Sequence, residues 1–340
     1  MKKQFFPIVV IILCPIILYG QDIHFSQFSN SPAMLNPAST GVNVTDFRFV
    51  YNYKNQWKSI SSPYKTHAFS YDMPFLKDQL TNGSVAGGIS VLSDKAGDLN
   101  FGTTQINISI AANKNINANN NISLGIQGGV TQKSLQGDLV AQQWDSEYDP
   151  NSPSGYLDNQ SSGAGIENIS YGDFSTGLLW NNDGNILRSH LGLSLFHLNM
   201  PKHSLVGGDD KLNVKWVLHG GTDVQISGES IRLIPQFQVL KQGPQSETNL
   251  GGMVKYRLQE ASIYSGEIRE VAIFMGGWYR LGDAFIPCVQ FKYYSISFGL
   301  SYDITLSDIN IAAASKGGFE FSMTYLHPFP PFKKAATPLM

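Results

Sequence analysis

Apolar and polar residues alternate with a period of two along most of the chain. The clearest example is residues 295–303, where large apolar side chains (Ile296, Phe298, Leu300 and Tyr302) are separated by small or polar ones. Successive side chains of a β-strand point to opposite faces, so this segment predicts a strand with one apolar and one polar face. The same period recurs from about residue 47 to about residue 325, and it predicts an all-β protein.

Turn signals divide the alternating region into hairpins. Residues 102–112 and 122–131 alternate on either side of the Asn-rich stretch 113–121. Each arm has about ten residues, the length that a tilted strand needs to cross a bilayer. About fourteen such strands, roughly twenty residues each with their connections, fit between residues 46 and 326. Pro235 lies inside one of them, and proline in a strand normally requires a sheet edge or a bulge.

No long amphipathic helix is available to cover the apolar strand faces, so we expect lipid to cover them. Charged residues make up only 15% of the chain, against about 25% in typical soluble domains. The polar faces would then line an enclosed lumen. Aromatic residues reach 12%, as the two interfacial girdles of a membrane barrel require. The pattern thus predicts an antiparallel transmembrane outer-membrane β-barrel of about fourteen strands over residues 46–326, with the lipid bilayer as one partner.

The first twenty residues predict a secretory signal peptide. Lys2 and Lys3 precede an apolar run over residues 5–18, and cleavage after Gly20 would start the mature chain. Pro7 and Pro15 interrupt this run, which is also short for a membrane-spanning helix. A lipoprotein signal would use Cys14, but the preceding Leu13 is bulky for that processing.

Three further segments break the alternation. Residues 21–45 contain two X-Pro pairs and Gly41, which predict an extended, turn-rich lead-in. Residues 134–168 form a long polar loop, for which a contact surface and simple packing over the barrel mouth are equally good interpretations. Residues 327–340 form a Pro-rich C-terminal tail.

Several short motifs resemble those of the PorP/SprF family of outer-membrane proteins. They are Gln21–Phe28, Leu35–Ala38 with Gly41, Tyr53–Trp57 and Ser301–Ser307, and the resemblance extends over essentially the whole mature chain. It implies an outer-membrane barrel associated with the type IX secretion system of Bacteroidota. Its expected partners are other type IX secretion components and a large secreted adhesin-like surface protein, such as those used in gliding motility.

The chain offers little that suggests an enzyme or a cofactor. No phosphate-binding loop, zinc-protease motif or nucleophile elbow occurs, and the net charge of −2 gives no basic footprint for nucleic acid. We therefore expect no catalytic, cofactor-binding or metal-binding residues and no nucleic-acid partner. His67, His197 and His219 are expected to lie within strands and could face a polar lumen, but an enzyme would also need a nucleophile within reach.

Other candidate sites are weaker still. Asp22 and His24 could start a metal site, but no further ligand follows at a suitable spacing. Asp94 and Asp98 could bind calcium, although a solvated loop is the better interpretation. Cys288 is the only cysteine beyond the leader and is expected to be a small buried or lipid-facing side chain. Two other functions stay open from the sequence alone: a porin or small-molecule channel, and a soluble exported β-sandwich that binds a ligand.

Overall fold

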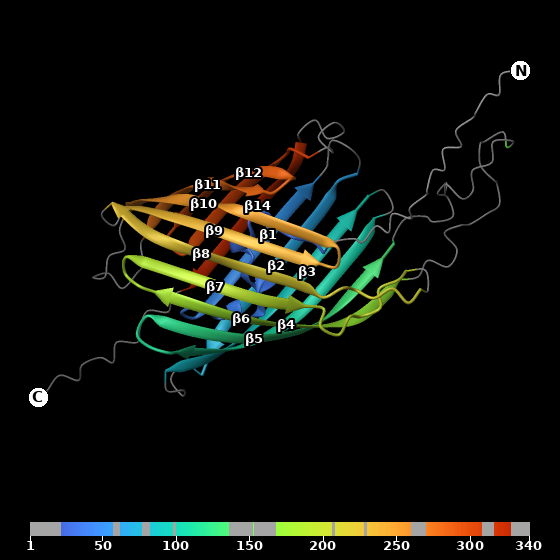
Figure 1. Cartoon of the computed structure of the whole chain (residues 1–340), viewed down its shortest axis with the longest axis horizontal. Coiled ribbons are helices and arrows are strands. Elements are labelled where there is room, and N and C mark those ends of the chain that lie inside the picture. Colours follow the sequence, from blue (N-terminus) through green and yellow to red (C-terminus); the bar gives the residue numbers. More distant parts are fainter. Residues whose placement is uncertain are drawn as a thin grey trace, which may run out of the picture.

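Within the residues that the structure describes, fourteen antiparallel strands form a closed barrel in the computed structural model of the chain (Figure 1). Residues 22–56, 62–76, 82–97, 100–135, 152, 168–205, 208–227, 230–259, 270–307 and 316–327 are described. Each strand pairs with its neighbours in sequence, and β1 (Phe47–Gln56) closes the barrel against β14 (Lys316–His327). The fourteen-strand antiparallel barrel is confirmed. The β-sandwich alternative is wrong, because the first and last strands pair in one continuous sheet.

The remaining twelve strands follow in chain order. They are β2 (Tyr64–Phe75), β3 (Gly83–Ala96), β4 (Phe101–Asn115), β5 (Asn120–Ser134), β6 (Ile169–Asp183), β7 (Leu187–Phe196), β8 (Lys215–Ser227), β9 (Ile231–Gln242), β10 (Gln245–Gln259), β11 (Val271–Arg280), β12 (Ala284–Tyr293) and β13 (Ile296–Thr305).

Burial along the strands is the reverse of that in a soluble protein. On β4, Ile106, Ile108 and Ile110 point outward and Ile108 is 61% exposed, whereas Asn107 and Ser109 point inward and are each 4% exposed. Residues 295–303, where the alternation is clearest, show the same reversed burial: Leu300 is exposed and Ser301 is buried. Large apolar side chains ringing the outside of a closed barrel are the surface that a bilayer covers.

A charge on this outer face should destabilise the protein. We expect Ile108→Lys, at the middle of β4, to lower the free energy of unfolding by about 2–4 kcal/mol, because it places an ammonium group in hydrocarbon. Urea unfolding in lipid vesicles measures the effect. Ala118→Lys, in the exposed turn between β4 and β5, is the matched control and should change the free energy by less than about 0.5 kcal/mol. Equal effects of the two substitutions would contradict a lipid-facing position for Ile108.

The connections at the two ends of the barrel differ in length. One end of the barrel lies opposite the start of β1, and we call it the loop end. Its connections include residues 135–168, 197–214 and 306–315. At the other end, the turn end, they include residues 116–119, 184–186 and 294–295, with residues 260–270 as a longer exception. Outer-membrane barrels place short turns toward the periplasm and long loops toward the exterior, which assigns the turn end to the periplasmic side.

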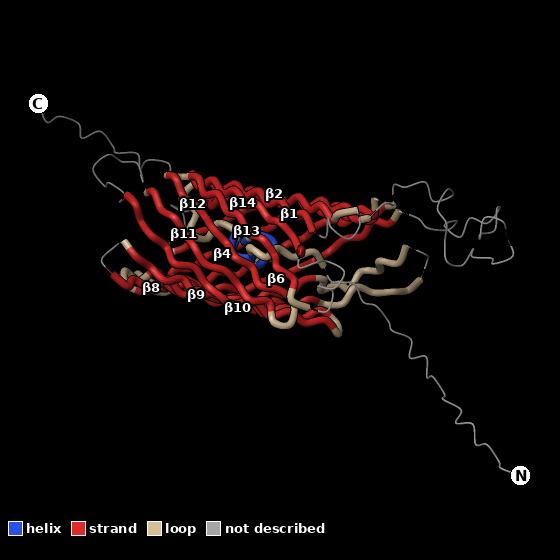
Figure 2. Tube along the Cα trace, turned by 90° about the horizontal axis from the view of Figure 1, so that it is seen from above, coloured by secondary structure: helices blue, strands red, loops and turns tan. Residues whose placement is uncertain are grey.

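Residues 22–46, which we call the plug, lie inside the barrel (Figure 2). They contain three short helical segments: η1 (Phe28–Asn30), α1 (Pro32–Leu35) and η2 (Pro37–Ser39). The expected extended conformation is therefore wrong for residues 28–30, 32–35 and 37–39, whereas the expected turns are present. Pro32 and Pro37 each begin a helical turn, where their fixed φ is favourable, and the Asn36 side chain accepts a 2.8 Å hydrogen bond from the Ala38 N–H. Among the residues described, no helix has the length and apolarity needed to cross a membrane.

Pro235 lies in the interior strand β9 rather than at a sheet edge. The ladder to β8 is interrupted beside it: Gly221 pairs with Gln236 and Val224 pairs with Leu233, and the residues between have no register partner. Proline has no N–H to donate, so an irregular ladder is the expected accommodation. The Arg232 guanidinium partly fills the gap by donating to the Asp223 carbonyl oxygen at 3.2 Å.

Candidate functional site

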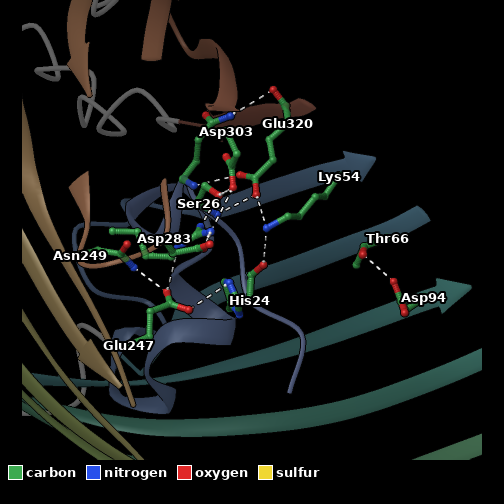
Figure 3. A network of polar contacts seen from close by, with 12 residues as sticks. His24, Ser26, Lys54, Thr66, Asp94, Glu247, Asn249, Asp283, Asp303 and Glu320 are labelled. Carbon is green, nitrogen blue, oxygen red and sulfur yellow. Dashed lines mark hydrogen bonds and ion pairs between the residues drawn. The ribbon is translucent and has the colours of Figure 1, made fainter. Parts of the chain in front are cut away.

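Glu320 of β14 is the main polar anchor of the plug (Figure 3). Its two carboxylate oxygens accept hydrogen bonds from the backbone N–H groups of Ser26 and Gln27, at 2.7 and 2.9 Å. The Lys54 ammonium group lies 3.0 Å from the same carboxylate and also donates to the His24 carbonyl oxygen at 3.1 Å. Glu320 and Lys54 are almost fully buried, so the wall carries an ion pair that is removed from water. The backbone of the plug supplies the remaining hydrogen bonds of this pair.

A second buried network continues from Ser26 toward β10 and β11 (Figure 3). Arg280 donates to the Ser26 hydroxyl at 2.7 Å, and that hydroxyl donates to Asp303 at 2.8 Å. Arg280 also forms an ion pair of 3.2 Å with Asp303. On the neighbouring strand Glu247 lies 3.1 Å from the His24 imidazole. Charged side chains of the wall thus surround the first residues of the plug.

The middle of the plug is held through its own carbonyl groups. Ser194 donates to the Leu35 carbonyl oxygen at 2.7 Å, and Ser123 donates to the Ala38 carbonyl oxygen at 2.6 Å. The Asn36 amide nitrogen donates to the Leu178 carbonyl oxygen at 3.1 Å and lies 3.1 Å from His219 Nε2. Because the Asn36 amide oxygen accepts from Ala38, its nitrogen is the donor to His219. His219 therefore carries its proton on Nδ1.

Glycines on the inner wall make room for the plug. A Cβ atom at Gly125 of β5 would lie 2.4 Å from the Ala38 backbone nitrogen, and one at Gly177 of β6 would lie 1.9 Å from the Asn36 side-chain oxygen. Such a close approach leaves no space for a side chain. The wall is therefore shaped to the plug as well as hydrogen-bonded to it.

At the turn end the plug is fixed by an ion pair. Asp72 accepts a 2.7 Å hydrogen bond from the Gly41 N–H and is held by Arg48, whose guanidinium donates to both carboxylate oxygens. The same guanidinium donates to the Ser39 carbonyl oxygen at 3.0 Å. On β4 the Ser109 hydroxyl lies 2.9 Å from the Thr40 hydroxyl. These contacts lock the residues that lead directly into β1.

Apolar side chains of the plug pack against the strands from β7 to β12. Phe28 meets Trp278 edge to face with ring centroids 5.7 Å apart, a favourable arrangement for aromatic rings. Leu35 joins the same buried cluster, whose wall members are Phe196, Val217, Leu240, Met253, Trp278, Ala284, Ile286 and Cys288. Hydrophobic burial thus adds to the polar contacts that hold the plug.

Asp22, the first described residue, is bound at the loop end. Its carboxylate lies 2.5 Å from the His197 imidazole and 2.7 Å from the Lys215 ammonium, and His197 also lies 2.9 Å from Asp173. Burial opposes ionisation of Asp22, but Lys215 and His197 outweigh it and hold the pKa of that carboxyl well below its usual range. Burial also disfavours the charged ring of His197, but the two carboxylates raise its pKa.

This contact should make plug anchoring depend on pH. The protonated His197 ring, whose pKa is raised in the folded protein, contributes its full stabilisation below about pH 6.5. This contribution is lost as the pH rises through the folded-state pKa of His197. The ionised Asp22 carboxylate, whose pKa is depressed in the folded protein, contributes its stabilisation above about pH 4. This contribution is lost as the pH falls through the folded-state pKa of Asp22. We therefore expect Asp22→Asn to lower the melting temperature most between about pH 4 and 6.5. A difference that grows steadily above this window would contradict the assignment.

Of the three histidines proposed for the lumen, two face inward and one faces outward. His197 and His219 are buried and face inward, as predicted, but His197 follows the last residue of β7 instead of lying within a strand. The expectation is wrong for His67: its neighbours Thr66 and Ala68 are buried, so His67 falls on the outer face, where its Nδ1 lies 2.9 Å from the Tyr51 hydroxyl. The two-residue period decides this, because one register position separates the lumen from the lipid face.

The other candidate residues of the sequence can also be compared with their positions in the structure. Asp22 and His24 contact different partners, and within the described ranges no group of three or more His, Cys, Asp or Glu side chains is placed to hold a metal ion. Asp94 is buried and accepts a 2.6 Å hydrogen bond from Thr66, whereas Asp98 lies outside the described residues. Cys288 is a buried member of the apolar cluster. Nearly all of the 134–168 loop lies outside the described residues.

These features define an outer-membrane β-barrel whose lumen is occupied by its own N-terminal segment. The chain belongs to the PorP/SprF family: the sequence model described as type IX secretion system membrane protein PorP/SprF matches residues 17–325. The resemblance seen in the short motifs is confirmed, and the barrel and the family both place the protein in the outer membrane.

Several solved structures are similar to this chain. The toluene transporter TbuX of Ralstonia pickettii has a TM-score of 0.50 at 11% identity over 86% of this chain and 92% of its own. The monoaromatic hydrocarbon channel CymD gives 0.47 at 13% identity over 88% and 94%. A Pseudomonas aeruginosa FadL homologue gives 0.46 at 11% over 87% and 94%. At these identities the likeness shows the fold alone. A search of curated proteins found no match.

Proposed function

We propose that this protein is a non-enzymatic component of type IX secretion that supports the export or surface attachment of large adhesin-like proteins. The observation that carries the proposal is the plug in a barrel of the PorP/SprF family. A segment held by buried ion pairs, backbone hydrogen bonds and an apolar cluster is built to remain in the lumen. Such a barrel suits a stable partner platform better than a passive conduit. Cleavage of residues 1–20 as a signal peptide is part of the same proposal.

Comparative surface proteomics of a deletion strain tests this role. Loss of the gene should remove particular large surface proteins, and wild-type complementation should restore them. Uptake of small solutes should be unchanged, since the proposed role involves no solute passage. An unchanged surface proteome would reject the secretion role.

A passive channel is the competing function. The observation in its favour is the barrel likeness to TbuX, which is described as a toluene transporter. Transport through the present barrel would require the plug to move, and that means breaking the buried contacts of Glu320, Asp72 and Asp22. Stable single-channel conductance of the purified full-length protein in a planar bilayer would favour the channel over the secretion role.

A further inference from the structure

A polar cavity of about 600 Å³ lies between the plug and the wall at the turn end. The plug lines it with residues 43–45, and the wall lines it from four adjacent strands: residues 181–183 at the end of β6, residues 188–190 at the start of β7, Thr222 and Asp223 of β8, and Ile234 of β9. This volume is typical of ligand sites. The interrupted ladder beside Pro235 borders the same cavity.

A buried hydrogen-bond donor of the cavity wall has no partner among the described residues. Asn181 is 5% exposed, yet nothing among the described residues accepts a hydrogen bond from its amide nitrogen. His190 also lines the cavity. Its ring centroid lies 6.0 Å from that of His219, which is not a lining residue and whose buried, protonated Nδ1 has no acceptor among the described residues. Buried donors of this kind cost free energy unless an acceptor reaches them.

Arg188 supplies a cation to the same cavity. It is exposed and forms no hydrogen bond or ion pair within the described ranges. Asp183 and Asp223 are its register partners on the two neighbouring strands. Asp223 is occupied by an ion pair with Arg232, and Asp183 at the rim is the one described carboxylate of the cavity wall without such a partner. The cavity wall therefore combines one buried unpaired donor, Asn181, with one guanidinium group, Arg188, that has no ion-pair partner within the described ranges.

We propose that this cavity binds a carboxylate group, with Arg188 as the cationic anchor and Asn181 as an uncharged donor. A guanidinium group presents paired N–H donors that match the two oxygens of a carboxylate. The source is a small free carboxylate or the C-terminal carboxylate of a peptide that enters from the turn end. The inference stands apart from the secretion role, because binding is a property of the purified barrel.

Fluorescence anisotropy with a tetra-alanine peptide that carries a neutral nitrobenzoxadiazole label on its N-terminus tests the proposal. The purified full-length protein should bind the free acid at least about tenfold more tightly than the C-terminal amide, since the amide lacks the charge. Arg188→Gln should abolish this preference. Lys211→Gln, an exposed position at the loop end, is the matched control and should leave it intact. Competition with acetate distinguishes the sources: displacement indicates a small carboxylate, and its absence indicates a peptide end.

Two further variants keep the test independent of folding. Asn181→Leu removes the buried donor at similar volume and should weaken binding of the free acid. Asp183→Asn removes a repulsive charge and should tighten it about twofold to fivefold. Equal affinity for acid and amide, no detectable binding of either, or an unchanged preference in Arg188→Gln would overturn the proposal.

Discussion

Deletion of residues 22–45 should turn a silent barrel into a conducting one. A barrel of fourteen strands lies between the small barrels that side chains fill and the porins of 16–18 strands that hold an aqueous channel. Its inner wall is largely polar, so water and ions would enter once the plug is absent. In planar bilayers we expect no stable conductance from the full-length protein and discrete single-channel currents from the deletion variant.

The control for this experiment is a deletion outside the plug. Removal of residues 328–340, which follow β14, should leave the protein silent. Conductance of the full-length protein equal to that of the plug deletion would show that residues 22–45 do not block the lumen. A silent plug deletion that still migrates as a folded barrel would contradict the account equally.

Replacement of Glu320 by alanine should cause the largest loss of stability among single substitutions of the plug network. It leaves the Lys54 ammonium buried without its partner and removes the acceptor of two backbone N–H groups of the plug. Breaking a buried ion pair in this way costs about 3–5 kcal/mol. Glu320→Gln keeps one acceptor oxygen, and its cost should therefore be smaller. Urea unfolding in detergent micelles measures both.

An exposed ion pair provides the matched control. Asp209 pairs with Lys202 in the connection between β7 and β8, and its side chain is 87% exposed. Because water screens such a pair, Asp209→Ala should leave the free energy of unfolding essentially unchanged. Similar losses for Glu320→Ala and Asp209→Ala would mean that the contacts of Glu320 with the plug contribute little to stability.

The alternation of side chains predicts the barrel, its strand number and the outward orientation of the large apolar side chains. This succeeds because lipid reverses the usual burial pattern without changing the two-residue period, as Ile108 and Asn107 show. The error at His67 arises from the same rule applied without fixing the register: between the inward-facing Thr66 and Ala68 it could only point outward.

The plug could not be predicted from the alternation, because residues 22–46 have no strand period. One signal was available in the wall. Gly125 and Gly177 stand at inward-facing positions, and a glycine inside a strand often marks the close approach of another backbone. Which segment approaches depends on contacts such as that of Ser26 with Glu320, which are 294 residues apart in sequence.

Oxidative cross-linking in native outer membranes tests the position of the plug most directly. The hydroxyl oxygens of Thr40 and Ser109 lie 2.9 Å apart, close enough for two cysteine sulfurs to form a disulfide after a small adjustment. In a Cys288→Ala background, the pair Thr40→Cys and Ser109→Cys should cross-link readily on mild oxidation, and the linked peptides should be found by mass spectrometry. The pair Thr40→Cys and Ser301→Cys, which joins the plug to β13 instead, should not. Equal or absent cross-linking of both pairs would contradict a plug that lies in the lumen against β4.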